Sequence, residues 1–215
     1  MKLKKLKIFL ASIMVFGMCN LNVVSTFASE KNTLPINNIA IQQQLEAFDA
    51  IDQEIKENGI QLDKGASEKS ARAYPTRKGV ILVTKDGSFG SLVGHVGIIY
   101  SSGSTVESFP DGGVATYSNT WNTRYKKVYG ASVSGTSATQ DASAANVAYS
   151  YRGKPYNWNF LNINTTSSFY CSQLVYRGYL NATGKNLNQN QGGGIVSPID
   201  LIQSSNTYTI YTQGV

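Results

Sequence analysis

The sequence predicts an α+β domain in which an antiparallel β-meander packs against helices, and three observations lead to this prediction. From Lys78 onward, β-branched runs alternate with short turns rich in glycine and serine, which is typical of hairpin-connected strands. Apolar residues at helical spacing lie before and after that region. The 215-residue chain is also long enough for one domain with a sizeable core after a leader is removed.

The leader is residues 1–28, which have the organisation of a secretory signal peptide. Four lysines precede an apolar run over 8–18, and Thr26 and Ala28 occupy the −3 and −1 positions of a cleavage site. The apolar run is too short to span a bilayer comfortably, although an uncleaved membrane anchor is the alternative. We therefore expect a secreted protein, extracellular or associated with the cell wall, that loses Cys19 with its leader.

Removing the leader also changes the charge balance. Of the 19 Lys and Arg residues, four lie in the leader, so the mature chain keeps 15 basic and 13 acidic residues. No basic block with interleaved aromatic residues remains, so nucleic acid is not expected as a partner. No further apolar run of about 18 residues occurs, so no integral membrane span is expected after leader removal. The oligomeric state stays open.

Residues 29–75 are expected to form an N-terminal helical segment and a connector. A helix is predicted over 38–58, capped by Asn37 or Asn38 and closed by Gly59. Its apolar stripe consists of Ile41, Leu45, Phe48, Ile51 and Ile55. This segment is interpreted either as a helix packed on the main domain or as a pro-segment that covers a site.

Residues 76–215 form the predicted main domain, and its first half is the meander. The expected strands are 79–84, 92–100, 105–109 and 114–118, and residues 85–91 are interpreted as a loop.

The second half of the main domain mixes helices with a final strand. Ser137 and Gln140 have capping-box spacing, which predicts a helix near 138–152. A second helix is expected in the Cys171 segment, a short one capped by Ser197 follows, and a strand over 207–212 ends the chain.

Few kinds of chemistry are open to this chain, because its mature part has one cysteine and one histidine. A structural zinc site needs about four Cys or His ligands, so no metal site is predicted. No P-loop and no nucleophile-elbow pattern occurs. No cofactor is expected.

Cys171 and His95 are the remaining candidates for chemistry, as nucleophile and base. A thiolate is a strong nucleophile, and a nearby histidine generates it. If Ser167 or Ser168 caps the predicted helix, Cys171 lies in its first turn, where the helix favours negative charge. The alternatives are a buried structural thiol and a histidine at the edge of the core.

Glu107 is the candidate that orients the histidine. It lies twelve residues after His95, across the turn at 101–104. If a short loop joins the two strands, Glu107 is a direct or diagonal neighbour of His95 on the sheet. A register slip of one residue would turn the carboxylate to the other face, where it would be an ordinary solvated group.

These motifs resemble a known family. PYNWNF (155–160) with YCSQLV (170–175) resembles the cysteine block of NlpC-type papain-like cysteine peptidases. GHVGIIY (94–100) with VES (106–108) resembles their histidine block. The histidine block comes first here, as in the circularly permuted, YiiX-like branch related to lecithin–retinol acyltransferase. The resemblance covers about 76–210.

The resemblance implies a circularly permuted papain-like fold, an antiparallel β-meander or barrel packed against the helix that carries the cysteine. It implies Cys171 as nucleophile, opening onto a cleft, His95 as base and Glu107 as the orienting residue. Tyr156 matches a tyrosine that assists the oxyanion. Tyr170 stands where murein-cleaving members carry an acidic residue that receives the peptide amine.

Two further departures from the family pattern accompany Tyr170. The glycines of the family's WGG are Asn159 and Phe160 here, and Gln173 stands where the family has glycine. These positions therefore do not support the inference that this chain shares the cell-wall peptide substrate of the murein-cleaving members.

The function expected from the sequence is an exported cysteine hydrolase of peptidase or amidase type. We expect it to cleave an amide bond in a peptide, with a cell-wall-derived peptide as one candidate, through a Cys-His-Glu triad. One alternative is a lipid-directed acyl hydrolase or transferase, suggested by Phe160, Phe169 and Tyr170. The other is a secreted binding module without catalysis. The expected partners are thus peptide, amino-acid-derived or lipid substrates.

Overall fold

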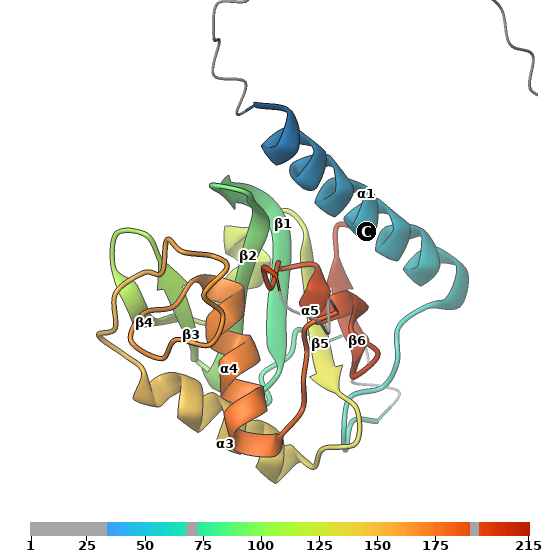
Figure 1. Ribbon diagram of the computed structural model, residues 1–215. Helices are drawn as coiled ribbons and strands as arrows, with labels where there is room; N and C mark the ends of the chain where they lie inside the picture. The colour runs from blue at the N-terminus through green and yellow to red at the C-terminus, as the bar shows by residue number, and fades with distance from the viewer. Residues whose placement is uncertain (1–33, 68–72, 190–193) are drawn as a thin grey trace, which may run out of the picture. The chain divides into compact units, whose positions relative to one another are not determined.

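The computed structural model describes residues 34–67, 73–189 and 194–215 (Figure 1). The predicted leader at 1–28 and its cleavage site lie outside these residues. Within them, no helix combines the length and the apolar character needed to cross a membrane.

The described chain consists of helices and of strands that form one sheet. The strands are β1 (Ile81–Phe89), β2 (Leu92–Ser101), β3 (Ser104–Phe109), β4 (Gly113–Ser118), β5 (Val128–Val133) and β6 (Thr207–Gln213). The helices are α1 (Leu34–Asn58), α2 (Trp121–Arg124), α3 (Ala138–Ser150), α4 (Cys171–Thr183) and α5 (Asp200–Gln203).

The sheet is antiparallel throughout, with the strand order β4-β3-β2-β1-β5-β6. The predicted meander is confirmed as β1 to β4, whereas β5 and β6 extend the sheet from the other side of β1. The sheet is not closed into a barrel, so of the two forms that were expected only the open one is present. Its end strands among the described residues are β4 and β6, which do not pair with each other.

Alternation along β1 gives the sheet two buried faces. Ile81 and Val83 belong to the core that also contains α3 and α4, whereas Val80 and Leu82 belong to a smaller core on the other side. Trp121 of α2 closes that second core. Buried strands of this kind appear in a sequence as continuous apolar runs, which is why 79–84 was readable as a strand.

The predicted loop at 85–91 is wrong for most of its length, because β1 continues to Phe89. The pairing with β2 shifts between Thr84 and Ser88, so the glycine-containing segment between them is a bulge and not a connection. Gly94 faces this bulge with a φ of +86°, and a Cβ there would lie 2.0 Å from the Thr84 carbonyl oxygen. Only glycine fits at that position.

Helices α3 and α4 cover one face of the sheet, and Figure 1 shows them crossing next to each other. The capping box of α3 is confirmed: the Ser137 N–H donates to the Gln140 side chain at 2.8 Å, and the Gln140 N–H donates to Ser137 Oγ at 3.2 Å. Gly178 allows the close approach of α4, because a Cβ there would meet the Ala144 carbonyl oxygen at 3.0 Å.

Helix α1 begins at Leu34, earlier than the predicted asparagine cap, and ends before Gly59, which has the predicted left-handed conformation. It packs on the main domain. Phe48 is fully buried and stacks on Tyr129 at 5.7 Å. The Tyr129 hydroxyl in turn donates to Asp52 at 2.5 Å, and Lys127 forms an ion pair with the same carboxylate.

The amide of Gln44 gives α1 a second attachment, at the β1–β2 hairpin. Its Nε2 donates to the Ser91 carbonyl at 2.8 Å, and its Oε1 accepts from the Val93 N–H at 3.0 Å. The helix is therefore held near its middle, at Gln44, and along its second half, at Phe48 and Asp52. These contacts show α1 packed on the main domain, and the pro-segment interpretation stays a prediction.

A buried carboxylate fixes the connector to α3. Asp141 is fully buried and accepts from Lys64 at 2.7 Å and from Arg77 at 2.8 Å. Arg77 also pairs with Asp63 at 2.7 Å. Because a buried charge needs charged or hydrogen-bonding partners, these contacts fix both ends of the connector's described part to the domain.

The end of the chain agrees with the prediction for its strand but not for its last helix. β6 confirms the strand expected over 207–212. α5 starts at Asp200, and the predicted cap is reversed: the Asp200 carboxylate accepts from the N–H and hydroxyl of Ser197 at 2.6 and 2.7 Å.

Candidate active site

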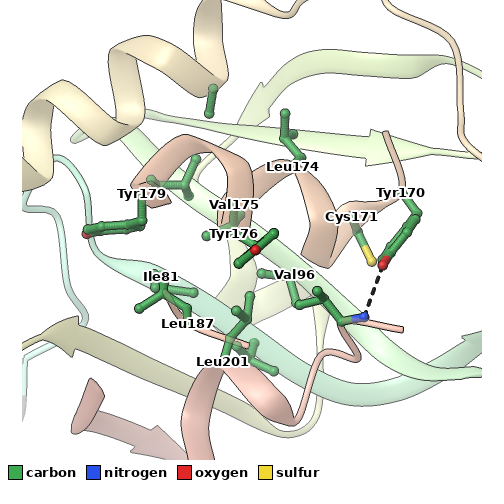
Figure 2. Packing of buried hydrophobic residues seen from close by; sticks show 14 of the residues in the cluster. Ile81, Val96, Tyr170, Cys171, Leu174, Val175, Tyr176, Tyr179, Leu187 and Leu201 are labelled. Atoms are coloured by element: carbon green, nitrogen blue, oxygen red, sulfur yellow. Dashed lines mark hydrogen bonds between the residues drawn. The ribbon is translucent and has the colours of Figure 1, made fainter. Parts of the chain in front are cut away.

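Cys171 is the first residue of α4, as Figure 2 shows. The helix is preceded by Tyr170 in the N-cap position, so neither Ser167 nor Ser168 is the cap. Instead, the Gln173 side chain accepts from the Tyr170 N–H at 3.2 Å. Cys171 thus lies in the predicted first turn, where backbone N–H groups have no acceptor within the helix.

The apolar face of α4 holds this first turn in place. Leu174, Val175 and Tyr179 are fully buried along the helix (Figure 2), and the Ser172 hydroxyl donates to the Val196 carbonyl at 2.6 Å. The segment before the helix is tied to β3, because Ser108 Oγ donates to the Phe169 carbonyl at 2.6 Å. The thiol is thereby placed near the end of the strands that carry His95 and Glu107.

His95 lies on β2 with its ring between two aromatic side chains. Phe109 stacks on it at 4.1 Å, with 24° between the ring planes, and Trp121 stacks at 5.6 Å and 18°. Stacking on both sides restricts rotation of the imidazole about its χ2 bond. The ring plane is therefore set by packing before any hydrogen bond is counted.

Glu107 lies on β3 and reaches His95 diagonally, as the turn length predicted. Its direct partner on β2 is Gly97, and its Oε2 lies 2.9 Å from His95 Nε2. Gly97 leaves room for this contact, because a Cβ there would come within 2.9 Å of Glu107 Cγ and 2.8 Å of Trp121 Cζ2. The second glycine of the GHVGI segment is thus a requirement of the acidic side chain opposite.

Three further donors hold the other carboxylate oxygen of Glu107. Thr105 Oγ1 donates to Oε1 at 2.5 Å, Trp121 Nε1 at 2.9 Å and Arg124 Nη2 at 2.6 Å. None of the three was predicted from the sequence. Trp121 and Arg124 belong to the four-residue helix α2, which is too short to show a periodic pattern in the sequence. Thr105 could have been found, because residues two apart on a strand point to the same face and Thr105 therefore lies beside Glu107.

The charges of this centre favour an ionised carboxylate and a protonated imidazole. Burial alone lowers the pKa of His95, but the adjacent Cys171 and Glu107 outweigh it and raise the pKa to about 9. Burial raises the pKa of Glu107, and His95 with Arg124 outweighs that effect and holds the pKa below its usual range. Because the carboxylate can only accept, His95 Nε2 carries the proton between them.

The other ring nitrogen, His95 Nδ1, is buried and has no hydrogen-bond partner among the described residues. The Cys171 thiol lies close enough to raise the pKa of the ring, although its distance and angle do not make a hydrogen bond to Nδ1. Such loose contacts between nucleophile and base are common before substrate binds.

Tyr156 joins this group, because its hydroxyl is also buried without a hydrogen-bond partner in the described part of the chain. Burial, followed by the nearby Cys171, raises the pKa of its phenol far above the usual range. Its hydroxyl is therefore neutral and has a proton to donate.

Tyr170 has a different environment. Its ring is fully buried, and its hydroxyl donates to the Phe160 carbonyl at 3.2 Å and accepts from the Val196 N–H at 3.0 Å. Tyr170 therefore connects the loop of Phe160 with the loop of Val196. Figure 2 shows the bond to the loop at 196 beside Cys171.

The thiol does not open onto a cleft in this structure. Both Cys171 and His95 are covered, with exposed fractions of 0% and 1%. The groups come together as the sequence predicts, but they do so in a closed centre.

The described residues do not offer a metal centre. They contain no group of three or more His, Cys, Asp or Glu side chains placed to hold an ion. The one imidazole of the site is committed to Glu107 through Nε2.

Comparison with known proteins finds similarity in sequence and in fold. A family model described as permuted papain-like amidase enzyme, YaeF/YiiX, C92 family, matches residues 83–206, more than half of the chain. The uncharacterized protein YycO of Bacillus subtilis (strain 168) is 33% identical over 165 residues, which cover 73% of this chain and 64% of that protein. The match therefore spans somewhat less than two thirds of the relative's length.

A crystal structure of a protein titled metalloprotein yiiX, from Escherichia coli O157:H7, has a similar fold. It superposes with a TM-score of 0.52 at 20% identity and covers 64% of this chain and 97% of its own. At this identity the likeness concerns the fold alone.

We predict that Gly97→Ala disturbs the candidate site through Glu107 and Trp121. The added methyl would overlap both side chains, and overpacking of this kind typically costs about 1–3 kcal/mol. The midpoint temperature of thermal unfolding and the rate of alkylation of Cys171 should both be lower than in the wild type. Gly103→Ala is the matched control, because a Cβ there meets nothing within 4 Å; equal effects of the two changes would contradict this account.

We also predict an unusual titration for the single histidine of the chain. In an NMR titration, His95 should lose its proton at about pH 9 and not near 6.5. Because the pKa of His95 is raised on folding, its charged contact with Glu107 contributes fully to stability below pH 6.5. This contribution is lost as the pH rises through about 9.

Glu107→Gln and Cys171→Ala should each shift this titration to lower pH, since each removes a group that raises the pKa. Asp111→Asn, at an exposed turn, is the control and should leave the curve unchanged. A histidine that titrates near its usual value in the folded wild type would rule out the charge arrangement described above.

Proposed function

The chain belongs to the permuted papain-like amidase family, YaeF/YiiX, C92, and we propose that it is a cysteine hydrolase that cleaves an amide bond in a peptide substrate. The observation that carries this proposal is the contact set around His95. One nitrogen is fixed on a buried carboxylate at 2.9 Å, and the other is buried, unpaired and beside the only thiol of the described chain.

In the proposed reaction, the proton of the Cys171 thiol is already on His95 Nδ1, which agrees with the protonated imidazole described above, and the sulfur reacts as a thiolate. The sulfur then attacks the carbonyl carbon, a C–S bond forms, and the electron pair of the C=O bond moves to the oxygen. Return of that pair breaks the C–N bond, while the imidazolium gives its proton to the leaving amine. Water, deprotonated by His95, then hydrolyses the thioester and regenerates the thiol.

Two groups are proposed to stabilise the oxyanion of this reaction. The Tyr156 hydroxyl is a buried neutral donor without a partner, and the first backbone N–H groups of α4 adjoin the sulfur. Glu107 keeps the imidazole in the tautomer and orientation that the transfer requires, as the third residue of such triads does. Tyr170 is proposed to shape the site and not to bind a peptide amine, since its hydroxyl is already bonded to Phe160 and Val196.

The proposal predicts rapid alkylation of Cys171 in the folded protein near neutral pH, slowed strongly by His95→Ala. Loss of a general base typically costs about 10²–10⁴-fold in rate. The measurement is intact-mass spectrometry after timed exposure to iodoacetamide, with Ser143→Ala, a half-buried position on α3, as the control. A thiol that reacts only after denaturation would remove the basis of the proposal.

Substrate assays distinguish the two alternative functions, a lipid-directed acyl hydrolase or transferase and a binding module, from a peptide amidase. A panel of peptide amides and acyl esters, each assayed with wild type and Cys171→Ala, tests for the lipid-directed reaction. Of the aromatic residues that suggested it, Phe169 and Tyr170 are fully buried. Full biological effect of Cys171→Ala would favour a binding module.

We further propose that the protein is exported on the leader at 1–28. The support is the sequence pattern of four lysines, an apolar run and small residues at Thr26 and Ala28. The prediction is a mature protein that begins at Ser29, found outside the cell by mass spectrometry. An intact N-terminus on the membrane fraction would instead identify an uncleaved anchor.

A further inference from the structure

The closed state of the candidate site requires a movement before any carbonyl group can reach the sulfur. Cys171 and His95 are covered, and the two polar atoms that face the thiol region, His95 Nδ1 and Tyr156 Oη, are buried without partners. Buried polar atoms are normally paired, and exceptions concentrate at sites completed by a ligand. The question is which side chain holds the place of that ligand.

Phe160 spans the two halves of the site. On the helix side, its ring meets Tyr170 edge to face at 5.2 Å and Tyr156 at 6.5 Å. On the sheet side, it lies against the tip of the β1–β2 hairpin, where a Cβ on Gly90 would come within 2.9 Å of its Cε2. Phe160 is half-buried and contacts both the residues next to the nucleophile and the hairpin that leads into β2, the strand of the base.

The loop that carries Phe160 is fixed at both ends by Gln173. The buried amide of Gln173 accepts from Asn157 at 2.9 Å and donates to the carbonyls of Asn162 and Thr165 at 3.1 and 3.3 Å. Movement of the loop as a whole would break these bonds. A change of the Phe160 side chain alone would break none of them.

The outer side of the same loop is apolar. Trp158 and Leu161 are 62% and 71% exposed, and they flank Phe160 in the sequence. Their rings and methyl groups provide an apolar surface onto which a displaced phenyl ring can pack. This surface lowers the cost of exposing Phe160, because less of its area returns to water.

We propose that Phe160 is a specificity-determining residue whose ring occupies the binding place of an uncharged, apolar group of the substrate. The proposal rests on the function proposed above. When substrate enters, the phenyl ring turns outward toward Trp158 and Leu161, and the substrate's apolar group takes its place between Tyr156 and Tyr170. The scissile carbonyl then lies next to Cys171, where Tyr156 Oη finds its acceptor.

The preference for an uncharged group follows from Tyr156 and Tyr170, the side chains that line the position of the Phe160 ring. Tyr156 and Tyr170 remain neutral, because burial raises the pKa of both phenols. A charged group would lose its hydration there without gaining a counter-charge from either ring. An apolar group instead replaces the buried area that the phenyl ring gives up.

The test uses maleimides that share one reactive group and differ in their substituent: N-methyl, N-benzyl and N-carboxyethyl. Labelling of Cys171 in the folded full chain is followed by intact mass. Because labelling scales with the population of the open state, Phe160→Ala should accelerate it. We expect the benzyl-to-methyl rate ratio to rise about tenfold as the vacated place accepts the ring, with the carboxyethyl reagent gaining least.

Phe160→Leu should give an intermediate ratio and provides a second variant if the alanine form is poorly folded. Asn159→Ala is the matched control, since it truncates an exposed side chain of the same loop that takes no part in the contacts of Phe160; its benzyl-to-methyl ratio should stay within about twofold of wild type. Thermal unfolding of each variant establishes that it is folded during labelling.

The outcomes separate this inference from the proposed function. An unchanged ratio in folded Phe160→Ala and Phe160→Leu, with a reactive thiol, would overturn the role of Phe160 and leave the nucleophile intact. Equal increases in Asn159→Ala would mean general loosening of the loop and would overturn it as well. A thiol inert to every reagent in every folded variant would overturn the cysteine mechanism itself.

Discussion

The buried carboxylate of Glu107 is the constraint around which the candidate site is organised. A charge without access to water must be met by donors, or it destabilises the fold by several kcal/mol. Here one oxygen takes the imidazole of His95, and the other takes Thr105, Trp121 and Arg124. These donors come from β2, β3 and α2, so one charge fixes three elements relative to one another.

This requirement also accounts for features that seem unrelated along the chain. Helix α2 has four residues and no side-chain cap, yet its Trp121 both donates to Glu107 and stacks on His95. Gly97 has no side chain because the carboxylate and the indole fill that space. The orientation of the imidazole is thus a consequence of satisfying the carboxylate, and the same contacts raise its pKa.

How much of the fold was predictable depended on how local each signal is. The capping box of Ser137 and Gln140 and the C′ glycine at 59 involve neighbours in sequence, and both were readable. The diagonal contact between His95 and Glu107 needed only the length of one turn. β5 was not anticipated, because its partners β1 and β6 are remote and its segment VYGASV has no clear alternation.

The candidate site shows the same limit. The residues that approach one another could be named from motifs, but the covering of Cys171 depends on contacts between loops. Three departures from the family pattern, Tyr170, Phe160 and Gln173, contact one another through the Tyr170 hydroxyl and N–H. In the sequence these three residues are separate departures, whereas in the fold they form one connected group next to the thiol.

The burial of Cys171 also has a consequence for its oxidation. Conversion of a thiolate to sulfenic acid depends on access of the oxidant, and reversal commonly uses a second thiol. Cys171 is the only cysteine in the described residues, so no neighbouring sulfur is present there to resolve an oxidised form. The closed site therefore protects the thiol from oxidation, and peroxide can reach the sulfur only while the site is open.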